Sequence, residues 1–224
     1  MTTRLYLIRH GSTTLSAEDR FAGAVDVALS DEGRRQAAAL GARLASEKIV
    51  AVYASPMQRA VHTAAAVAEP HGLTVQTRDG LREIGHGRWE GLRRSEAEAQ
   101  FPEEYAAWET DPFTVSPEGG ESGLATMARA LPAIREIVLA HPGGSVAVVS
   151  HKATIRLVLA SLLGIDARGY RDRLDQSPAC LNAVDFRDPV RARLMLYNDI
   201  SHYAGQPERP TQRLSSWWDP PTPG

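Results

Sequence analysis

The stretch Arg4-Leu5-Tyr6-Leu7-Ile8-Arg9-His10-Gly11 decides the fold of this chain. Its apolar run predicts a short buried strand in the interior of a parallel sheet. Gly11 allows a sharp turn at little steric cost. A guanidinium and an imidazole therefore emerge at the carboxyl end of a strand, which is the edge where open α/β sheets bind ligands. Taken alone, Arg9 and His10 are equally consistent with a capped sheet edge and an ordinary loop histidine.

Length and composition favour one globular domain with a sizeable core, since the chain has 224 residues, 43% of them hydrophobic. The formal net charge of -2 provides no basic field, so we expect neither nucleic acid nor a membrane as a partner. Cys180 is the single cysteine, which excludes an intrachain disulfide and a multi-cysteine metal site. No stretch is apolar for long enough to span a bilayer, and the N-terminus lacks a signal-peptide pattern. We therefore expect a cytoplasmic protein.

Strand and helix signals alternate along the first part of the chain. Apolar runs predict buried strands at residues 4–9, 49–54, 73–77 and 145–150, and a final strand pair at 181–186 and 193–197. Helices are predicted after Ser30 and Ser55, which we expect to be N-caps, with Pro56 in the first turn. This order predicts a single three-layer α/β domain, in which a mostly parallel central sheet carries helices on both faces.

The segment at about residues 85–121 interrupts this alternation. It is punctuated by glycine yet carries large apolar and charged residues, so we expect a small helical lid over the strand ends. The α/β domain is predicted over residues 1–205. A proline-rich, irregular tail is predicted over 206–224. Pairing of sheet edges into a homodimer stays open, because no motif specifies it.

Two predicted strand-to-helix junctions carry histidines, His10 and His151, and a third carries Arg59. In a parallel sheet all three lie at one edge, beside Arg9. Guanidinium groups, helix N-terminal amides and imidazoles together favour a dianionic phosphoryl group. A cation in the first turn opposes the helix macrodipole, so Arg59 at that place indicates a function. The interpretation depends on the whole set, because each member alone has an ordinary role as a solvated arginine or a capping histidine.

Several motifs, in order, resemble those of the histidine phosphatase superfamily, the phosphoglycerate-mutase-like group. The matching segments are Leu7-Ile8-Arg9-His10-Gly11, residues 29–37, residues 55–64, Leu81-Arg82-Glu83-Ile84 with residues 87–92, and Val149-Ser150-His151 with Ile155-Arg156. Each motif is weak alone, but their shared order, from about Arg4 to Gly164, makes chance agreement very improbable.

The resemblance implies that His10 is the nucleophile and takes the phosphoryl group onto its imidazole. Arg9, Arg59 and His151 would hold the phosphoryl oxygens. Glu83 would protonate the leaving alkoxide and then activate water; its alternative is an exposed loop carboxylate. The chemistry agrees, since a covalent intermediate splits one hard step into two and a cationic ring stabilises the transferred group. No metal or other cofactor is required, and the flanking arginines favour the neutral imidazole needed for attack.

Departures from the mutase pattern favour a phosphatase. Leu15-Ser16 stands where the mutases carry Trp-Asn, and residues 93–122 are short and acidic, so we expect no second strongly anionic group on the substrate. Lys152 could add a cation near the phosphate or be solvated, Ser122 could bind substrate or cap a helix, and His86 is expected to pack within its loop. The predicted substrate-binding residues are Ser16, Phe21, Ala22, Gly23, Trp108, Glu121, Ser122 and Lys152.

The sequence thus predicts a metal-independent phosphomonoesterase for a small hydroxylated phosphate ester, acting through a phosphohistidine on His10. Two alternatives stay open: a phosphoglycerate mutase primed by a bisphosphate, and a non-catalytic phospho-ligand binder. A zinc site built from His10, His151 and Glu83 is disfavoured, because Arg9 and Arg59 would repel a dication.

Overall fold

The computed structural model describes residues 1–17 and 20–205, so the predicted tail lies outside the described residues. Its elements, in chain order, are β1 (Thr3–Arg9), α1 (Thr14–Ala17), α2 (Asp31–Leu44), β2 (Ile49–Ala54), α3 (Gln58–Ala68), η1 (Glu69–His71), β3 (Val75–Thr77), η2 (Asp79–Leu81), η3 (Gly87–Trp89), α4 (Arg94–Gln100), α5 (Pro102–Thr110), α6 (Gly123–Ala140), β4 (Ser145–Ser150), α7 (Lys152–Leu163), η4 (Ala167–Gly169), α8 (Tyr170–Arg173), β5 (Leu181–Phe186) and β6 (Ala192–Asp199).

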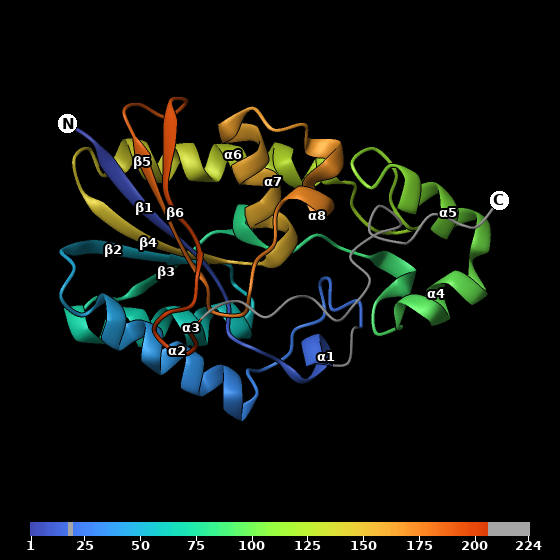
Figure 1. Ribbon diagram of the computed structural model, residues 1–224, viewed down its shortest axis with the longest axis horizontal. Coiled ribbons are helices and arrows are strands. Elements are labelled where there is room, and N and C mark those ends of the chain that lie inside the picture. Colours follow the sequence, from blue (N-terminus) through green and yellow to red (C-terminus); the bar gives the residue numbers. More distant parts are fainter. Residues whose placement is uncertain (18–19, 206–224) are drawn as a thin grey trace.

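A six-stranded sheet with the order β3-β2-β4-β1-β5-β6 forms the centre of the molecule (Figure 1). Strands β1 to β4 run parallel, whereas β5 and β6 are antiparallel additions at one side. In the middle of the sheet Arg9 pairs with Ser150, and the amide of His10 donates to the Ser150 carbonyl at 3.1 Å. The segments that begin with His10 and His151 therefore leave the same sheet edge side by side.

The side chains of β1 point alternately to the two faces of the sheet. Leu5 and Leu7 pack with α6 and α7 on one face, and Tyr6 and Ile8 pack with α2 and α3 on the other. Figure 1 shows these helix pairs on opposite sides of the strands. Because successive side chains of a strand point to opposite faces, a strand buried on both faces has to be apolar throughout. The predicted three-layer α/β fold is confirmed.

One predicted helix start is correct and one is wrong. Ser30 caps α2, since its hydroxyl accepts from the Gly33 amide at 3.1 Å. Helix α3 begins only at Gln58, with Met57 at the N-cap instead of Ser55. The hydroxyl of Ser55 accepts from the Met57 amide at 3.4 Å and so closes a turn before the helix. Arg59 still lies in the first turn of α3.

The lid segment forms η3, α4 and α5 around a small core of its own. Trp89 and Trp108 are fully buried there, and Tyr105 and Phe21 pack against them. Phe21 comes from the loop that follows β1, and its amide donates to the Leu92 carbonyl at 2.9 Å. The lid is therefore joined directly to the segment that follows the predicted nucleophile.

Candidate active site

His10 is buried at the carboxyl end of β1 and contacts His151, with 5.1 Å between ring centroids. Its Nδ1 lies 2.7 Å from the Gly11 carbonyl oxygen. Because a carbonyl oxygen only accepts, Nδ1 carries the proton and the lone pair lies on Nε2. Burial, and then the charges of Arg9 and Arg59, hold the pKa of His10 well below its usual range. The imidazole is neutral, with one nitrogen available for attack.

His151 has the opposite tautomer. The Nε of Arg59 donates to His151 Nδ1 at 3.3 Å, so the His151 proton lies on Nε2. That buried Nε2 has no hydrogen-bond partner within the described residues. Burial, together with His10 and Arg59, keeps the pKa of His151 low. His151 therefore places a neutral N–H donor next to the nucleophile.

Two buried guanidinium groups complete this end of the site. Arg59 also donates to the carbonyls of Val25 at 2.7 Å and Gly23 at 3.0 Å, which fixes the loop after β1. Arg9 donates to the Gln176 carbonyl at 2.6 Å, while its Nε is buried with no partner among the described residues. Burial lowers the pKa of both side chains, yet a guanidinium remains charged.

The carboxylate of Glu83 is held at the N-terminus of α7. It accepts from the amides of Ala153 and Thr154, each at 3.2 Å, and from the Thr154 hydroxyl at 3.2 Å. Amides at a helix N-terminus point toward an anion and attract it. The helix that follows His151 therefore also positions Glu83 at the same edge of the sheet.

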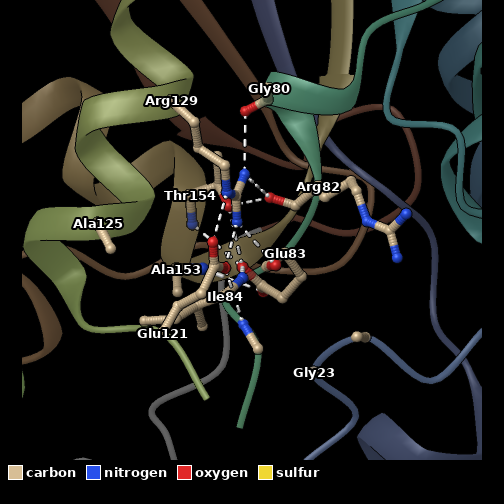
Figure 2. Close-up of polar contacts among 12 residues, drawn as sticks. Gly23, Gly80, Arg82, Glu83, Ile84, Glu121, Ala125, Arg129, Ala153 and Thr154 are labelled. Atoms are coloured by element: carbon tan, nitrogen blue, oxygen red, sulfur yellow. Dashed lines mark hydrogen bonds and ion pairs between the residues drawn. The ribbon is translucent and has the colours of Figure 1, made fainter. Parts of the chain in front are cut away.

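The backbone of the Glu83 loop is held from behind by Arg129 of α6 (Figure 2). Arg129 donates to the carbonyls of Gly80 at 3.0 Å, Arg82 at 2.8 Å and Glu83 at 2.9 Å. It also forms a bidentate pair with Glu121, at 2.8 and 2.7 Å. We call Arg129 and Glu121 the acid-loop clamp.

These groups surround a cavity of about 190 Å³. It is lined by nine of the residues predicted for the site: Arg9, His10, Phe21, Ala22, Gly23, Arg59, Glu83, Trp108 and Lys152. The sequence prediction did not include nine further lining residues: Thr13, Arg20, Ile84, His86, Arg94, Ala153, Arg156, Tyr170 and Arg171. His151 lies behind His10 and contacts its ring.

Two predicted substrate-binding residues, Glu121 and Ser122, are placed differently. Glu121 belongs to the clamp and lines a neighbouring cavity with Gly85, where the Gly85 amide donates to its carboxylate at 3.1 Å. Ser122 caps α6, with its hydroxyl accepting from the Ala125 amide at 3.2 Å, as the alternative for this residue predicted. The side chain of Ser16 lies outside the described part of the structure. Glu121 and Ser122 are absent from the cavity lining.

The charge of the cavity contradicts the expectation of an acidic lid. Glu83 is the only carboxylate in the lining within the described residues, which contains seven cations: Arg9, Arg20, Arg59, Arg94, Lys152, Arg156 and Arg171. The lid acids pair instead with arginines, as Glu104 does with Arg88 at 2.9 Å and Glu109 with Arg171 at 3.3 Å. Composition showed the acids of the lid but not their partners.

Of the cavity cations that the sequence prediction left out, Arg156 could have been found from its spacing in the sequence, whereas Arg171 could not. Lys152 and Arg156 are four residues apart at the start of a predicted helix, so they share one face. Both lie next to Asp175, at 3.2 and 2.7 Å. Arg171 belongs to a segment without any motif, and only the tertiary structure brings it to the site.

Among residues 1–17 and 20–205, no group of three or more histidine, cysteine, aspartate or glutamate side chains is placed to hold a metal ion. No helix within the same residues is long and apolar enough to cross a membrane.

The family of the chain follows from comparison with known proteins. The model of the histidine phosphatase superfamily (branch 1) matches residues 5–200. The chain belongs to this family, which confirms the resemblance seen in the motifs.

Three of the similar proteins carry phosphatase names. Phosphoserine phosphatase 1 of Hydrogenobacter thermophilus is 34% identical over 163 residues, covering 73% of this chain and 77% of that protein. Glucosyl-3-phosphoglycerate phosphatase of Mycobacterium tuberculosis is 35% identical over 175 residues, covering 75% and 78%. The solved structure of alpha-ribazole phosphatase from Shigella flexneri matches with a TM-score of 0.81 at 28% identity, covering 88% and 96%. These names agree with the predicted class, a phosphoric monoester hydrolase.

Proposed function

We propose that this protein is a metal-independent phosphomonoesterase that hydrolyses a small phosphorylated metabolite through a phosphohistidine on His10. One observation carries the proposal: a neutral His10 with its lone pair on Nε2 lies among Arg9, Arg59 and the N–H donor of His151. The names of the relatives support the phosphatase class, and the substrates in those names are small phosphorylated metabolites. The cations around the cavity would also repel a divalent metal ion.

The first step transfers the phosphoryl group to the protein. His10 Nε2 attacks phosphorus while the bond from phosphorus to the ester oxygen breaks, and Glu83 gives its proton to the departing alkoxide. The guanidinium groups and the His151 N–H stabilise the charge on the transferred oxygens. Because helix amides and the Thr154 hydroxyl hold the Glu83 carboxylate in the free protein, we infer that Glu83 gains its proton together with the arriving ester.

The second step returns the protein to its starting state. Glu83, now a carboxylate, takes a proton from water while the water oxygen attacks phosphorus and the bond to His10 Nε2 breaks. Inorganic phosphate leaves with the proton that the ester brought, so the imidazole is neutral and Glu83 is again a carboxylate, as in the free protein. No electron acceptor or metal ion enters this balance.

The test combines turnover with trapping of the intermediate. His10→Ala should abolish phosphate release from p-nitrophenyl phosphate in metal-stripped protein, and the acid-labile, base-stable phosphohistidine of the wild type should disappear with it. His62→Ala, at an exposed histidine of α3, is the matched control and should behave as wild type. Circular dichroism checks that each variant folds. Near-normal turnover by a folded His10→Ala protein would refute the covalent route, and isomerisation of 3-phosphoglycerate without phosphate release would instead identify a mutase.

A further inference from the structure

We propose that Lys152 is a nucleophilic amine that captures short phosphorylated aldehydes as an imine inside the cavity. This inference rests on the proposed function for the phosphoryl site, because Arg9 and Arg59 have to hold the phosphate of the aldehyde. In the capture step the amine nitrogen adds to the carbonyl carbon, and the carbonyl oxygen then leaves as water. The step needs no oxidant or reductant, and phosphate ester hydrolysis makes no use of it.

The choice of residue at this place is the first observation. The chain has 25 lysines and arginines in total, and only Lys48 and Lys152 are lysines. The other six cations that line the cavity are arginines. A guanidinium stays protonated and is no nucleophile, whereas a buried lysine loses its proton readily and forms imines. Lys152 therefore brings to the cavity a reactivity that its neighbours lack, in addition to charge.

The position of Lys152 gives it access to a ligand of the phosphoryl site. It is the first residue of α7 and directly follows His151. It lines the same cavity as Arg9, His10 and Arg59, and its side chain is 34% exposed. A short aldehyde whose phosphate lies at the two arginines would have its carbonyl group in the cavity that the amine lines.

The charges around Lys152 favour the neutral amine. Burial, and next the charges of Arg156 and Arg9, lower the pKa of Lys152 to about 8. Asp175 lies 3.2 Å from the amine, but its carboxylate also pairs with Arg156 at 2.7 Å and accepts from the Gln176 amide at 2.8 Å. A larger fraction of this amine is therefore neutral near pH 7 than of an exposed lysine, and the neutral form is the one that attacks a carbonyl carbon.

The cavity restricts the class of aldehyde. Its volume of about 190 Å³ is below the roughly 300–1,000 Å³ of ordinary ligand pockets, so the ligand has only a few carbon atoms. An imine protonated on nitrogen keeps the positive charge of the lysine. The product therefore still carries a cation beside Asp175 and beside the ligand phosphate, which favours the adduct.

The experiment uses glyceraldehyde 3-phosphate as the probe and glyceraldehyde, which lacks the phosphate, as its control. Full-length His10→Ala protein, which should leave the ester intact, is incubated with each aldehyde and with cyanoborohydride, which reduces an imine to a stable secondary amine. Peptide mass spectrometry measures labelling at Lys152, at the exposed Lys48 and at the N-terminal amine. We expect the phosphorylated aldehyde to label Lys152 at least about tenfold more than Lys48, and inorganic phosphate to suppress the difference.

Two variants separate the reactivity of Lys152 from its charge. Lys152→Arg keeps a cation at this place but forms no imine, so the adduct should be absent from position 152. Lys48→Met is the matched control and should keep the adduct on Lys152. In wild-type protein, reduction of the imine should lower p-nitrophenyl phosphate turnover in proportion to Lys152 labelling, because the adduct occupies the cavity. Lys152→Arg should lose no turnover on the same treatment.

The outcomes separate the two proposals. Equal labelling of Lys152 and Lys48, or labelling of Lys152 that glyceraldehyde matches and phosphate does not suppress, overturns the imine site. The phosphatase proposal then stands if the wild type hydrolyses p-nitrophenyl phosphate. If the wild type hydrolyses no ester, the phosphatase proposal fails, while labelling still decides the imine site because it requires no turnover. Should Lys152→Arg fail to fold, suppression of the label by phosphate in His10→Ala and in wild-type protein decides the site.

Discussion

The acid-loop clamp leads to a prediction about a residue outside the cavity lining. Arg129 makes five hydrogen bonds, two to the Glu121 carboxylate and three to backbone carbonyls of residues 80–83. Arg129→Met removes all five and leaves a hydrophobic side chain of similar length. We expect the Glu83 loop to lose its support while the fold is kept, because the other side of the loop remains bonded to α7.

The magnitude follows from the number and exposure of these bonds. The side chains of Arg129 and Glu121 are 24% and 34% exposed, so each bond contributes near the lower end of its usual range, about 0.5–1 kcal/mol. Loss of all five lowers the free energy of unfolding by about 3 kcal/mol, which corresponds to a decrease in Tm of roughly 6–12 °C for a domain of this size. Displacement of a catalytic group by about 1 Å reduces the rate roughly 10²-fold.

The assay compares leaving groups, because a misplaced Glu83 affects only esters that need a proton. For Arg129→Met we expect kcat with alkyl phosphates to fall about 100-fold and kcat with p-nitrophenyl phosphate to change much less. Arg135→Met, at an exposed arginine of the same helix, is the control for general destabilisation. Equal slowing of alkyl and aryl esters, or a lower Tm without any change in leaving-group dependence, would refute a positioning role for Arg129.

Two further predictions concern Glu83 and Lys152. Glu83→Gln should slow alkyl phosphates far more than aryl phosphates, by roughly 10²-fold or more, and equal slowing of both classes would remove Glu83 from the acid role. Lys152, with its pKa lowered to about 8 by burial, is charged below that pH and loses a positive charge from the cavity as the pH rises through it. The kcat/KM of the wild type should therefore decrease above about pH 8, because this ratio reports the free enzyme, and Lys152→Met should abolish the decrease. An alkaline limb that persists in the variant would assign the titration to another group.

The sequence alone was sufficient to predict that the residues at the ends of the parallel strands lie together at one edge of the sheet. Arg9 and His10 end one strand and His151 follows another, so parallel register alone brings them together. Arg59 was placed correctly although its helix begins later than expected, because two residues make little difference to which edge of the sheet it reaches. The family motifs added Glu83, whose contact with the α7 amides depends on a loop conformation that no periodicity predicts.

The lid was the part for which sequence reasoning failed, and the reason is physical. A count of acids predicts a negative surface only if the acids are unpaired, and here Glu109 faces Arg171. Arg171 is separated from Glu109 by 62 positions, so the pair depends on tertiary packing. The same reason applies to Glu121, which was predicted to contact substrate. In the structure its carboxylate is paired with Arg129, and no sequence pattern indicated this pair.

The joint between Phe21 and the lid has a consequence for any redesign of specificity. The Phe21 amide donates to the Leu92 carbonyl at 2.9 Å, and the Phe21 carbonyl accepts from the Gly91 amide at 2.8 Å. The Phe21 ring packs at a tilt against His86, with 4.6 Å between ring centroids. A lid taken from another protein would therefore lack the segment that forms these backbone hydrogen bonds and completes the aromatic core of the lid. The exchangeable module is discontinuous, and comprises residues 20–24 together with the lid. Chimeras that respect this boundary should fold, whereas those that exchange the lid alone should leave the nucleophile loop unsupported.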